Sequence, residues 1–470
     1  MAWSPETGSL DFRTLHDAYR AGTLTPSAVI DAVYDRIAVR GPDPAWTTLI
    51  PREEALARAA ALEASGEGPD ALPLFGLPCG IKDNFDIAGY PTSEACRANE
   101  RIAETTDPTV ARLVAAGAIV VGKNNMDQFG MGLVGVRTDY GIPSCVFDPA
   151  YISGGSTSGG GVVVAAGLVS FALGGDAAGS GRVPAALNAI VGHKPTNGLI
   201  PFGISKAGMG ASHTVLTLTV EDNVAALNTL VRHDPDDPLS LPEAEGFTLT
   251  VPPAPERFRF AVPSRESRLF AGDAAAEALF DAAIARLEAM GGTAVPFDYA
   301  PLHAAARMLY EDAFIARRYA NLEETFRRCG DRFHPASREI LASGARYSGA
   351  DVFIAQYRLA GYRKYAMRIF EDADVMVTPT TPTTFTIAAL EEKNIGRNAI
   401  MGSYTNFVNL MEFCALSVPN GFRPDGLAQG LMLIGPSFAD NRLLGLGAAY
   451  HRALGLPMGA TGHPLPVPAG

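Results

Sequence analysis

The sequence lacks the features of a membrane-spanning or secreted chain. Its 470 residues contain no run of about 18 consecutive apolar residues, so we expect no transmembrane helix. The first residues, Met-Ala-Trp-Ser-Pro-Glu, do not combine a basic segment with an apolar one, and we therefore expect no secretory signal. The five cysteines are odd in number and too widely spaced for a zinc or disulfide pattern, which indicates reduced thiols in a cytoplasmic protein.

Positively charged residues are also fewer than negatively charged ones. Asp and Glu number 50 against 38 Lys and Arg, and the formal net charge is −12. An acidic surface repels nucleic acid and anionic membranes, so neither is expected as a partner. An anionic substrate would need a local cationic group to bind it, because the overall field of the protein does not attract anions.

Histidines in a catalytic pattern are missing as well. The eight histidines are scattered, and no Gly-x-Ser-x-Gly elbow follows an obvious strand with a partner histidine downstream. His193, thirteen residues after Ser180, is the nearest candidate base, and a structural imidazole is the better interpretation. A serine nucleophile in this chain is therefore expected to use another base.

Alternating helical and strand patterns predict an α/β protein. Two short helices are expected within residues 9–38, the second with Thr25 as its N-cap and Pro26 at its first position. Further helices are predicted over 52–64, 108–116, 161–172, 274–290, 304–327 and 350–370, and strands over 79–82, 119–123, 258–262, 294–297 and 375–378.

This alternation predicts an α/β/α sandwich around a large mixed β-sheet, within a single domain of residues 1–470. Residues 1–70 are expected to form N-terminal helices, 71–232 a catalytic core, and 256–455 a second α/β part that carries substrate-binding helices. The Pro- and Asp-rich residues between the last two parts are expected to cross the surface. Residues 456–470 form a Pro- and Gly-rich tail, which we expect to add nothing to the core.

Two glycine-rich turns that contain serines carry the most information about function. Gly-Gly-Ser-Thr-Ser-Gly-Gly-Gly occupies 154–161, and Ala-Ala-Gly-Ser-Gly-Arg occupies 177–182. Such turns let backbone N–H groups converge on an oxyanion, and they permit unusual dihedral angles. The apolar flanks argue against a flexible linker. The three valines after the first turn exclude the Lys-Ser/Thr pair of a phosphate-binding loop.

Lys82, at the end of an apolar strand in Gly-Ile-Lys-Asp-Asn, is a candidate base. Burial disfavours an ammonium group and lowers its pKa, so that a buried neutral amine can accept a proton. The alternative is a surface lysine paired with Asp83, which these few residues taken alone would favour.

At these residues the chain resembles the amidase signature family, which has a Ser–cis-Ser–Lys triad and a Gly-Gly-Ser-Ser-Gly-type stretch. The matching residues are Lys82, Ser156 and Ser180, and the two serines are 24 residues apart, as in that family. The segments 122–129 and 192–196 also match, so the resemblance covers nearly the whole chain. It implies an amide hydrolase in which Lys82 is the base.

The resemblance also implies a mechanism. Ser180 would attack the amide carbonyl, and Ser156 would pass the proton to Lys82 through a cis Gly155–Ser156 arrangement. The backbone N–H groups of Ala177, Ala178, Gly179 and Ser180 would form the oxyanion hole. Asp176 and Arg182 are expected to brace this loop rather than to react. Neither a metal nor an organic cofactor is expected.

Within the family, the second half of the chain is most similar to the allophanate hydrolases, by the motifs 309–311, 318–319, 356–360, 404–410 and 413–419. This implies that Tyr310 and Arg318 hold the carboxylate of a small anionic amide and that Gly132 also belongs to the substrate site. Tyr310 and Arg318 are eight residues apart, which would place them near one face of a single helix. Arginine binds carboxylates through a bidentate fork. The alternative is that Arg318 is a solvated helix residue beside Arg317.

Three departures from the family pattern leave the substrate open. Thr157 follows the relay serine, His193 stands where Leu or Phe is usual, and residues 197–218 lack the expected Ser-Leu-Asp stretch. Hydrolysis of allophanate to ammonia and CO2 in nitrogen metabolism is the first hypothesis. The alternatives are an amidase for another short acid-amide, such as a malonamate-like compound, and an amidotransferase-type subunit that works in a complex. A homodimer is expected from the resemblance alone.

Overall fold

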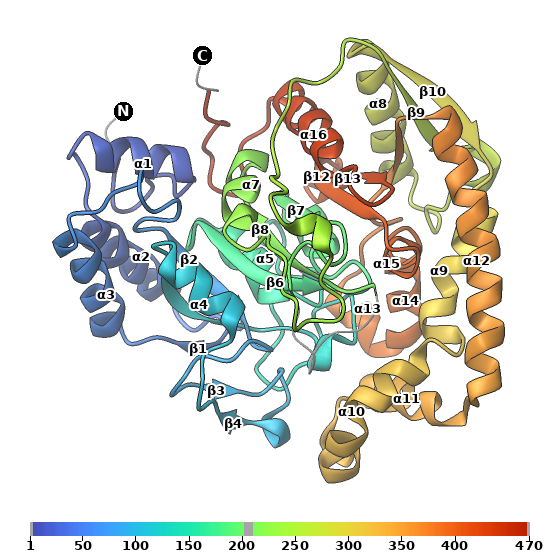
Figure 1. The fold of residues 1–470 in the computed structure, drawn as a ribbon, viewed down its shortest axis with the longest axis horizontal. Coiled ribbons are helices and arrows are strands. Elements are labelled where there is room, and N and C mark those ends of the chain that lie inside the picture. Colours follow the sequence, from blue (N-terminus) through green and yellow to red (C-terminus); the bar gives the residue numbers. More distant parts are fainter. Residues whose placement is uncertain (1–2, 202–209, 468–470) are drawn as a thin grey trace.

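A computed structural model of the chain describes residues 3–201 and 210–467. Its centre is a mixed sheet of 11 strands in the order β1-β5-β2-β6-β8-β7-β12-β13-β11-β9-β10, with helices on both faces (Figure 1). The predicted α/β/α sandwich with a large mixed sheet is confirmed. Part of the atypical segment 197–218, residues 202–209, lies outside the described residues.

The large sheet contains two groups of parallel strands, separated by antiparallel pairs. β2 runs parallel to β5 and β6, and β9 runs parallel to β10 and β11, whereas the pairs at the centre of the sheet are antiparallel. The strands of the large sheet are β1 (Trp46–Leu49), β2 (Pro78–Lys82), β5 (Ile119–Asn124), β6 (Phe171–Asp176), β7 (Val191–Lys194), β8 (Ser212–Thr217), β9 (Phe258–Pro263), β10 (Gly292–Phe297), β11 (Val375–Pro379), β12 (Cys414–Phe422) and β13 (Ala428–Gly435). β3 (Pro91–Thr92) and β4 (Arg101–Ile102) form a separate two-stranded antiparallel sheet.

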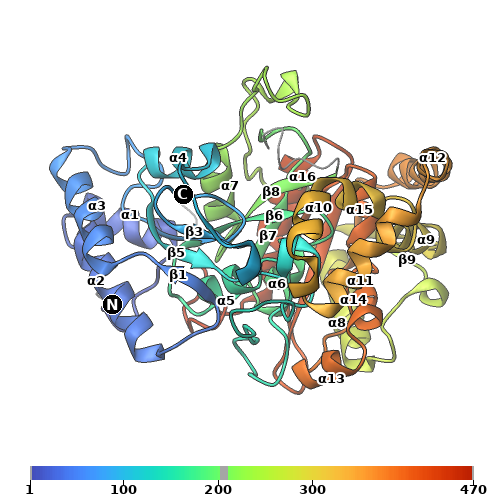
Figure 2. The same ribbon diagram turned by 90° about the horizontal axis from the view of Figure 1, so that it is seen from below.

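Helices surround this sheet, with the N-terminal ones at one end and α8 to α12 at the other (Figure 2). They are α1 (Phe12–Arg20), α2 (Pro26–Arg40), α3 (Arg52–Ala64), α4 (Pro108–Ala115), α5 (Ser158–Ala165), α6 (Arg182–Leu187), α7 (Val220–Asn228), α8 (Ala274–Ala289), α9 (Ala300–Glu311), α10 (Ile315–Cys329), α11 (Pro335–Ser343), α12 (Gly349–Asp372), α13 (Ile387–Glu392), α14 (Asn394–Met401), α15 (Asn406–Leu410) and α16 (Asp440–Leu454). In the described part of the chain, every helix is too short or too polar to span a bilayer.

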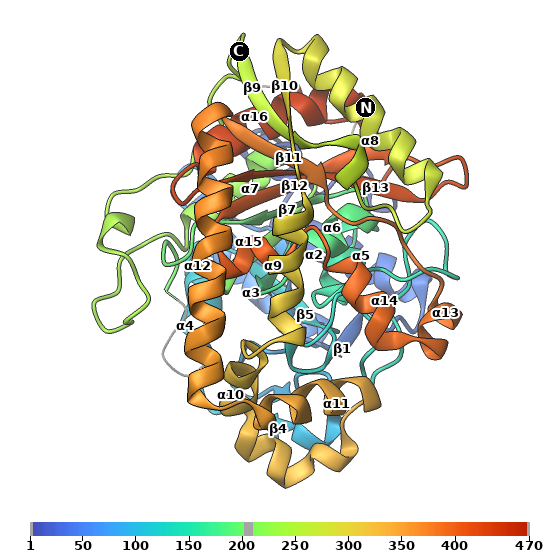
Figure 3. The same ribbon diagram turned by 90° about the vertical axis from the view of Figure 1, so that its right-hand side faces the viewer.

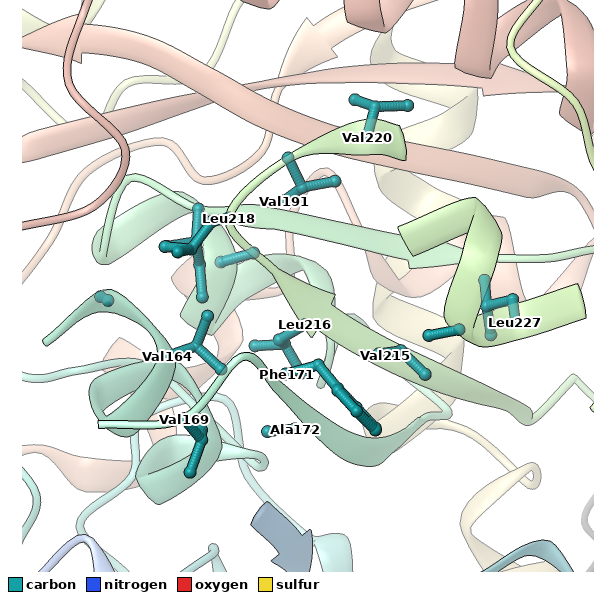
Figure 4. Close-up of a cluster of buried hydrophobic side chains, with 14 of the residues drawn as sticks. Val164, Val169, Phe171, Ala172, Val191, Val215, Leu216, Leu218, Val220 and Leu227 are labelled. Carbon is teal, nitrogen blue, oxygen red and sulfur yellow. The ribbon is translucent and has the colours of Figure 1, made fainter. Parts of the chain in front are cut away.

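The main core fills the space between the sheet and its helices. α7 and α16 contact each other over one part of the sheet, and α5 and α6 form a second contacting pair. Figure 4 shows buried side chains of β6, β8 and α7 in this core, among them Phe171, Leu216 and Leu227. The five cysteines are buried and free, as expected for reduced thiols.

Several predicted elements agree closely with the structure. The helix predicted over 52–64 has these bounds, and Thr25 caps α2 by accepting a hydrogen bond from the Ala28 N–H, with Pro26 as the first helical residue. The sequence signals at both places are local: an N-cap hydroxyl, a proline whose missing N–H costs nothing, and a run of strong helix formers.

Three predictions about elements are wrong. The helix predicted over 161–172 is α5 followed by strand β6, because the small residues of this run are compatible with either structure. The helix predicted over 304–327 is broken at 312–314, where Asp312 has extended backbone angles and pairs with Arg358 at 2.8 Å. The tail does add to the core: Met458 is 1% exposed and belongs to the main cluster.

Candidate active site

Three buried side chains form a continuous hydrogen-bonded line. Lys82 Nζ lies 2.7 Å from Ser156 Oγ, and Ser156 Oγ lies 2.8 Å from Ser180 Oγ. Each of the three residues is at most 2% exposed. The peptide bond between Gly155 and Ser156 is cis, as expected. The structure therefore brings together the three residues that the sequence analysis selected, in the expected order.

The sheet topology explains why residues so far apart in sequence meet. β2 ends at Lys82, and its parallel neighbour β6 ends four residues before Ser180. The carboxyl ends of parallel strands meet at one edge of a sheet, where ligand sites of α/β proteins are commonly found. Ser156 reaches the same edge from the loop that precedes α5.

The environment of Lys82 favours the neutral amine. Burial lowers the pKa of Lys82 to about 7, and the positive charge of Arg318 acts in the same direction, while Asp127 and Asp176 oppose the shift. Asp83 does not pair with Lys82, because its carboxylate lies 3.1 Å from the buried Lys123 amine. The alternative of a surface Lys82–Asp83 pair is thus wrong.

Asp176 organises the turn that carries Ser180. Its carboxylate accepts hydrogen bonds from the Gly179 and Gly181 N–H groups at 2.8 and 3.1 Å, and it pairs with the buried Arg182 at 2.9 Å. Burial alone would raise the pKa of Asp176, but the Arg182 guanidinium holds it well below its usual range. Asp176 and Arg182 thus brace the loop, as the sequence analysis expected.

One expected oxyanion donor is already engaged. The Gly179 N–H donates to Asp176, which leaves the N–H groups of Ala177, Ala178 and Ser180 from the expected set. The candidate oxyanion hole therefore has three of the four expected N–H donors, because the Asp176 carboxylate that holds the turn also accepts the Gly179 N–H.

Asp127 was missed by the sequence analysis as an organiser of the site. Its carboxylate accepts from the N–H groups of Val134, Gly135 and Arg137, at distances from 2.9 to 3.2 Å, and its own N–H donates to the Ser156 carbonyl at 3.2 Å. A single carboxylate thereby ties the loop after β5 to the turn that carries Ser156. The sequence match over 122–129 includes Asp127, but it does not indicate which groups the Asp127 carboxylate binds.

The triad faces a pocket of about 450 Å³, whose lining includes Lys82, Ser156 and Ser180. A larger cavity of about 740 Å³ lies between α11 and the α13–α14 turn, but none of the three triad residues lines it. We place the site in the smaller pocket, because chemistry is decided by the reacting groups rather than by volume.

Arg318 lines the triad pocket from α10. Its Nη1 lies 3.4 Å from the Phe129 carbonyl oxygen, and no described carboxylate lies within ion-pair distance of it. Arg317 lines the same pocket. Burial, and to a smaller extent the positive charge of Arg318, lower the pKa of Arg317 to about 10. In the sequence analysis, Arg317 was named only as the neighbour of Arg318 in the solvated-helix alternative. The break before α10, which turns both side chains toward the pocket, left no signal in the sequence.

The other two expected substrate residues do not line this pocket. Tyr310 lies on α9, across the break at 312–314, so the argument that it shares one helix face with Arg318 is wrong. Its hydroxyl is buried and has no hydrogen-bond partner among the described residues. Gly132 lies against Asp127, where a Cβ would be 2.5 Å from the carboxylate, so this position requires glycine.

His193 lies outside the triad pocket. Its ring is fully buried on β7, with Nε2 3.1 Å from the Asp440 carboxylate, which supports the structural interpretation. Among residues 3–201 and 210–467, no group of three His, Cys, Asp or Glu side chains converges in a way that would hold a metal ion.

Comparison with known proteins identifies similar chains. The family model described as Amidase matches residues 28–444. A urea amidolyase of Lachancea kluyveri is 37% identical over 423 residues, which cover 89% of this chain and 23% of the relative. A glutamyl-tRNA(Gln) amidotransferase subunit of Chloroflexus aggregans is 32% identical over 468 residues, which cover 93% of this chain and 95% of the relative.

Among solved structures, the allophanate hydrolase of Kluyveromyces lactis superimposes with a TM-score of 0.88 at 32% identity. The superposition covers 97% of this chain and 75% of that one. The chain spans about a quarter of the length of the urea amidolyases that it matches.

Proposed function

The chain belongs to the amidase signature family, and from this premise we propose that it hydrolyses a small carboxylate-bearing amide, allophanate in the first place, with Ser180 as the nucleophile. The observation that carries the proposal is the buried line from Ser180 through Ser156 to an amine whose pKa is lowered to about 7, in a pocket lined by Arg318.

In the proposed mechanism, Ser180 Oγ attacks the carbonyl carbon while its proton passes to Ser156 and the Ser156 proton passes to neutral Lys82. Hydroxyl groups rotate freely enough to serve as donor and acceptor in turn. The protonated relay then gives its proton to the departing nitrogen, the C–N bond breaks, and ammonia leaves an ester on Ser180. Water hydrolyses this ester by the same relay, which restores the serine and the free amine.

The N–H groups of Ala177, Ala178 and Ser180 are proposed to bind the oxyanion of the tetrahedral intermediate. They belong to the turn that Asp176 holds in place, so the donors need no reorganisation when charge develops on the carbonyl oxygen. Loss of one such donor in other hydrolases costs about 3 kcal/mol of transition-state stabilisation.

Arg318 is proposed to bind the substrate carboxylate, which would place the amide of a short acid-amide beside Ser180. Replacement Arg318→Ala should raise KM for carboxylate-bearing amides by about 10- to 100-fold, the loss expected for a hydrogen-bonded charge pair, and should change KM for neutral amides little. Steady-state kinetics on malonamate and a neutral analogue check this result. Arg327→Ala, at an exposed position on the same helix, is the matched control; equal losses on both substrates would remove Arg318 from this role.

Activity should depend on pH through Lys82. The reactive form is the free amine, so kcat/KM should rise with pH, level off above about pH 8, and at pH 5 lie about 100-fold below its plateau, two pH units under the lowered pKa. The measurement is a pH profile with an amide that does not itself titrate between pH 5 and 9. A profile that stays flat down to pH 5 would contradict the assignment of Lys82 as base.

The direct test of the proposed function is ammonia release by the isolated protein from allophanate, beside biuret, malonamate and a neutral amide. Allophanate should give the highest kcat/KM. A preference for malonamate would keep the mechanism and change the substrate, and a preference for the neutral amide would overturn the carboxylate-binding part of the proposal.

A second function, as an amidotransferase component, is favoured by one observation: the relatives described as amidotransferase subunits align over nearly their whole length. A component of that kind would need a partner chain for activity. Turnover of small amides by the purified chain argues against it, whereas failure of a fluorophosphonate probe to label Ser180 in the isolated chain argues for it.

A further inference from the structure

A short helix from the second half of the chain lies behind the turn that carries Ser180. This helix is α15, and Thr405 is its N-cap residue. Figure 1 and Figure 3 show α15 beside α9, and the two helices are in contact. The segment 404–410 contributed to the family resemblance, but no function of its residues followed from that match. The structure gives its polar side chains specific partners in the turn.

The Thr405 hydroxyl holds one peptide unit of this turn. Its Oγ1 donates a buried hydrogen bond of 2.6 Å to the Ala178 carbonyl oxygen. The N–H of the same peptide unit, which belongs to Gly179, donates to the Asp176 carboxylate at 2.8 Å. The peptide between Ala178 and Gly179 is thus held from both sides, and its plane cannot rotate without the loss of both hydrogen bonds.

Gly179 makes such external support necessary. Its φ angle is +121°, in a region that residues with a side chain rarely adopt. Because glycine adopts many other backbone conformations at little cost, the sequence of the turn does not select this one. Thr405 packs directly against it, since a Cβ at position 179 would lie 2.5 Å from Thr405 Oγ1. The conformation of the turn therefore depends on a residue from the second half of the chain.

Asn409, one helical turn after Thr405, binds the two residues that brace this turn. Its Nδ2 donates to the carbonyl oxygen and to the carboxylate of Asp176, at 3.0 and 3.1 Å, and its Oδ1 accepts from Arg182 at 2.6 Å. The Thr405 carbonyl oxygen also accepts from Arg182, at 3.4 Å. The segment 405–409 therefore contacts both ends of the turn as well as the peptide unit between them.

We propose that Thr405 is a positioning residue for the oxyanion hole. Its hydroxyl fixes the peptide between Ala178 and Gly179, which lies between the two peptides that carry the N–H groups of Ala178 and Ser180. Because peptide units are planar, the orientation of the middle one sets the direction of both donors. Thr405 is not among the described residues that line the triad pocket, so it acts through the turn. The proposal rests on the proposed function, since it takes Ser180 as the nucleophile.

The effect of Thr405 is expected on kcat and not on KM. Negative charge develops on the carbonyl oxygen only as Ser180 attacks, so displaced donors stabilise the transition state less while they bind the substrate as before. The donors must also be in place before the reaction begins, because their reorganisation would add to the barrier. A loss of the Thr405 hydroxyl should therefore slow the chemical step.

The first test is Thr405→Val, which keeps the shape of the side chain and removes the hydroxyl. It should lower kcat by about 10- to 100-fold and leave KM within about twofold, as for a small misplacement of the catalytic groups. The pH profile should still rise through pH 7, because Lys82 is unchanged. Thr405→Ser keeps the hydroxyl and should restore kcat to within about threefold of the wild-type value, because the hydrogen bond is kept.

Thr378→Val is the matched control for these variants. Thr378 is also fully buried, but its hydroxyl has no hydrogen-bond partner among the described residues. Its replacement should leave kcat within about twofold of the wild-type value. Thermal melting reports whether each variant is folded. If Thr405→Val does not fold, Thr405→Ala removes the same hydroxyl and should show the same loss of kcat.

Labelling of Ser180 by a fluorophosphonate separates this proposal from the choice of substrate. Ser180 Oγ forms a bond to phosphorus, the P–F bond breaks, fluoride leaves, and the serine proton passes through Ser156 to Lys82. The phosphoryl oxygen takes the place of the oxyanion, so Thr405→Val should slow labelling by a factor similar to its loss of kcat. A wild-type chain that is labelled but hydrolyses no tested amide would contradict the proposed substrate, and the labelling rates would still test Thr405. A wild-type chain that is neither labelled nor active would overturn both proposals for the isolated chain.

Three results would overturn the positioning role of Thr405. If Thr405→Val kept kcat and the labelling rate within about twofold of the wild-type values, the hydroxyl would not hold the turn. If Thr405→Ser lost as much activity as Thr405→Val, packing of the methyl group rather than the hydrogen bond would be responsible. If the loss appeared in KM with kcat unchanged, Thr405 would act on substrate binding rather than on the transition state.

Discussion

Replacement Ser180→Ala is expected to reduce amide hydrolysis by about a millionfold, the loss seen when the nucleophilic serine of another hydrolase is removed. The reason is that no other group in the proposed mechanism can form the ester. Ser180 is 2% exposed and its Oγ contacts only a small polar network, so removal of one oxygen should leave the melting temperature nearly unchanged. The measurement is ammonia release together with thermal melting of both proteins.

The control for this variant is Ser170→Ala. Ser170 is also fully buried and its hydroxyl has no hydrogen-bond partner among the described residues, but it lies just before β6, away from the pocket lining. Its removal should leave kcat within about twofold of the wild-type value, as for a substitution with no contact to the reacting atoms. If Ser180→Ala retained a tenth of the activity, the nucleophile would have to be sought elsewhere.

Replacement Lys82→Met is expected to lower kcat/KM by about 10⁴-fold, the upper range for loss of a general base. Methionine keeps most of the buried apolar stem and removes the amine that accepts the Ser156 proton. The residual activity should also lose the rise through pH 7, because the group that titrates is gone. A pH profile of the variant separates this loss from a structural effect, which would lower activity without changing the shape of the profile.

Lys393→Met, at an exposed lysine in the α13–α14 turn, is the comparison for loss of a positive charge. It should leave both the rate and the profile unchanged. If Lys82→Met kept the rise in activity through pH 7, the titrating group would have to be another residue of the pocket, and Lys82 would lose its role as base.

The candidate site was predictable from the sequence to an unusual degree, but for different reasons at different residues. Ser156 and Ser180 stand in glycine-rich turns whose chemistry is local, and the resemblance to a family linked them to Lys82. Arg318 was also found, although the helix argument that joined it to Tyr310 was wrong. That argument failed because Asp312, paired with Arg358, interrupts the predicted helix, and a pairing of residues 46 positions apart leaves no local signal.

Other parts of the site could not have been found from the pattern alone. Asp127 binds three N–H groups of the loop that follows it, and the Gly179 N–H is taken by Asp176 rather than left free for substrate. Both facts concern which donor meets which acceptor, and many residues of these types are available. Only the folded backbone selects the partners.

The sequence by itself determined the α/β architecture and the helix starts with strong caps, because turn chemistry and helix signals act over a few neighbouring residues. The three residues proposed for catalysis were selected through the resemblance of their motifs to a family, since the local sequence around Lys82 alone favours a surface lysine. Tertiary structure alone lowers the pKa of Lys82. The same Lys-Asp-Asn tripeptide on a surface would carry an ordinary ammonium group. Here strand β2 ends inside the protein, Asp83 pairs with Lys123, and the amine is shielded from water beside Arg318. A pKa depends on the dielectric and the charges around the group, and these come from segments distant in sequence that only folding brings together.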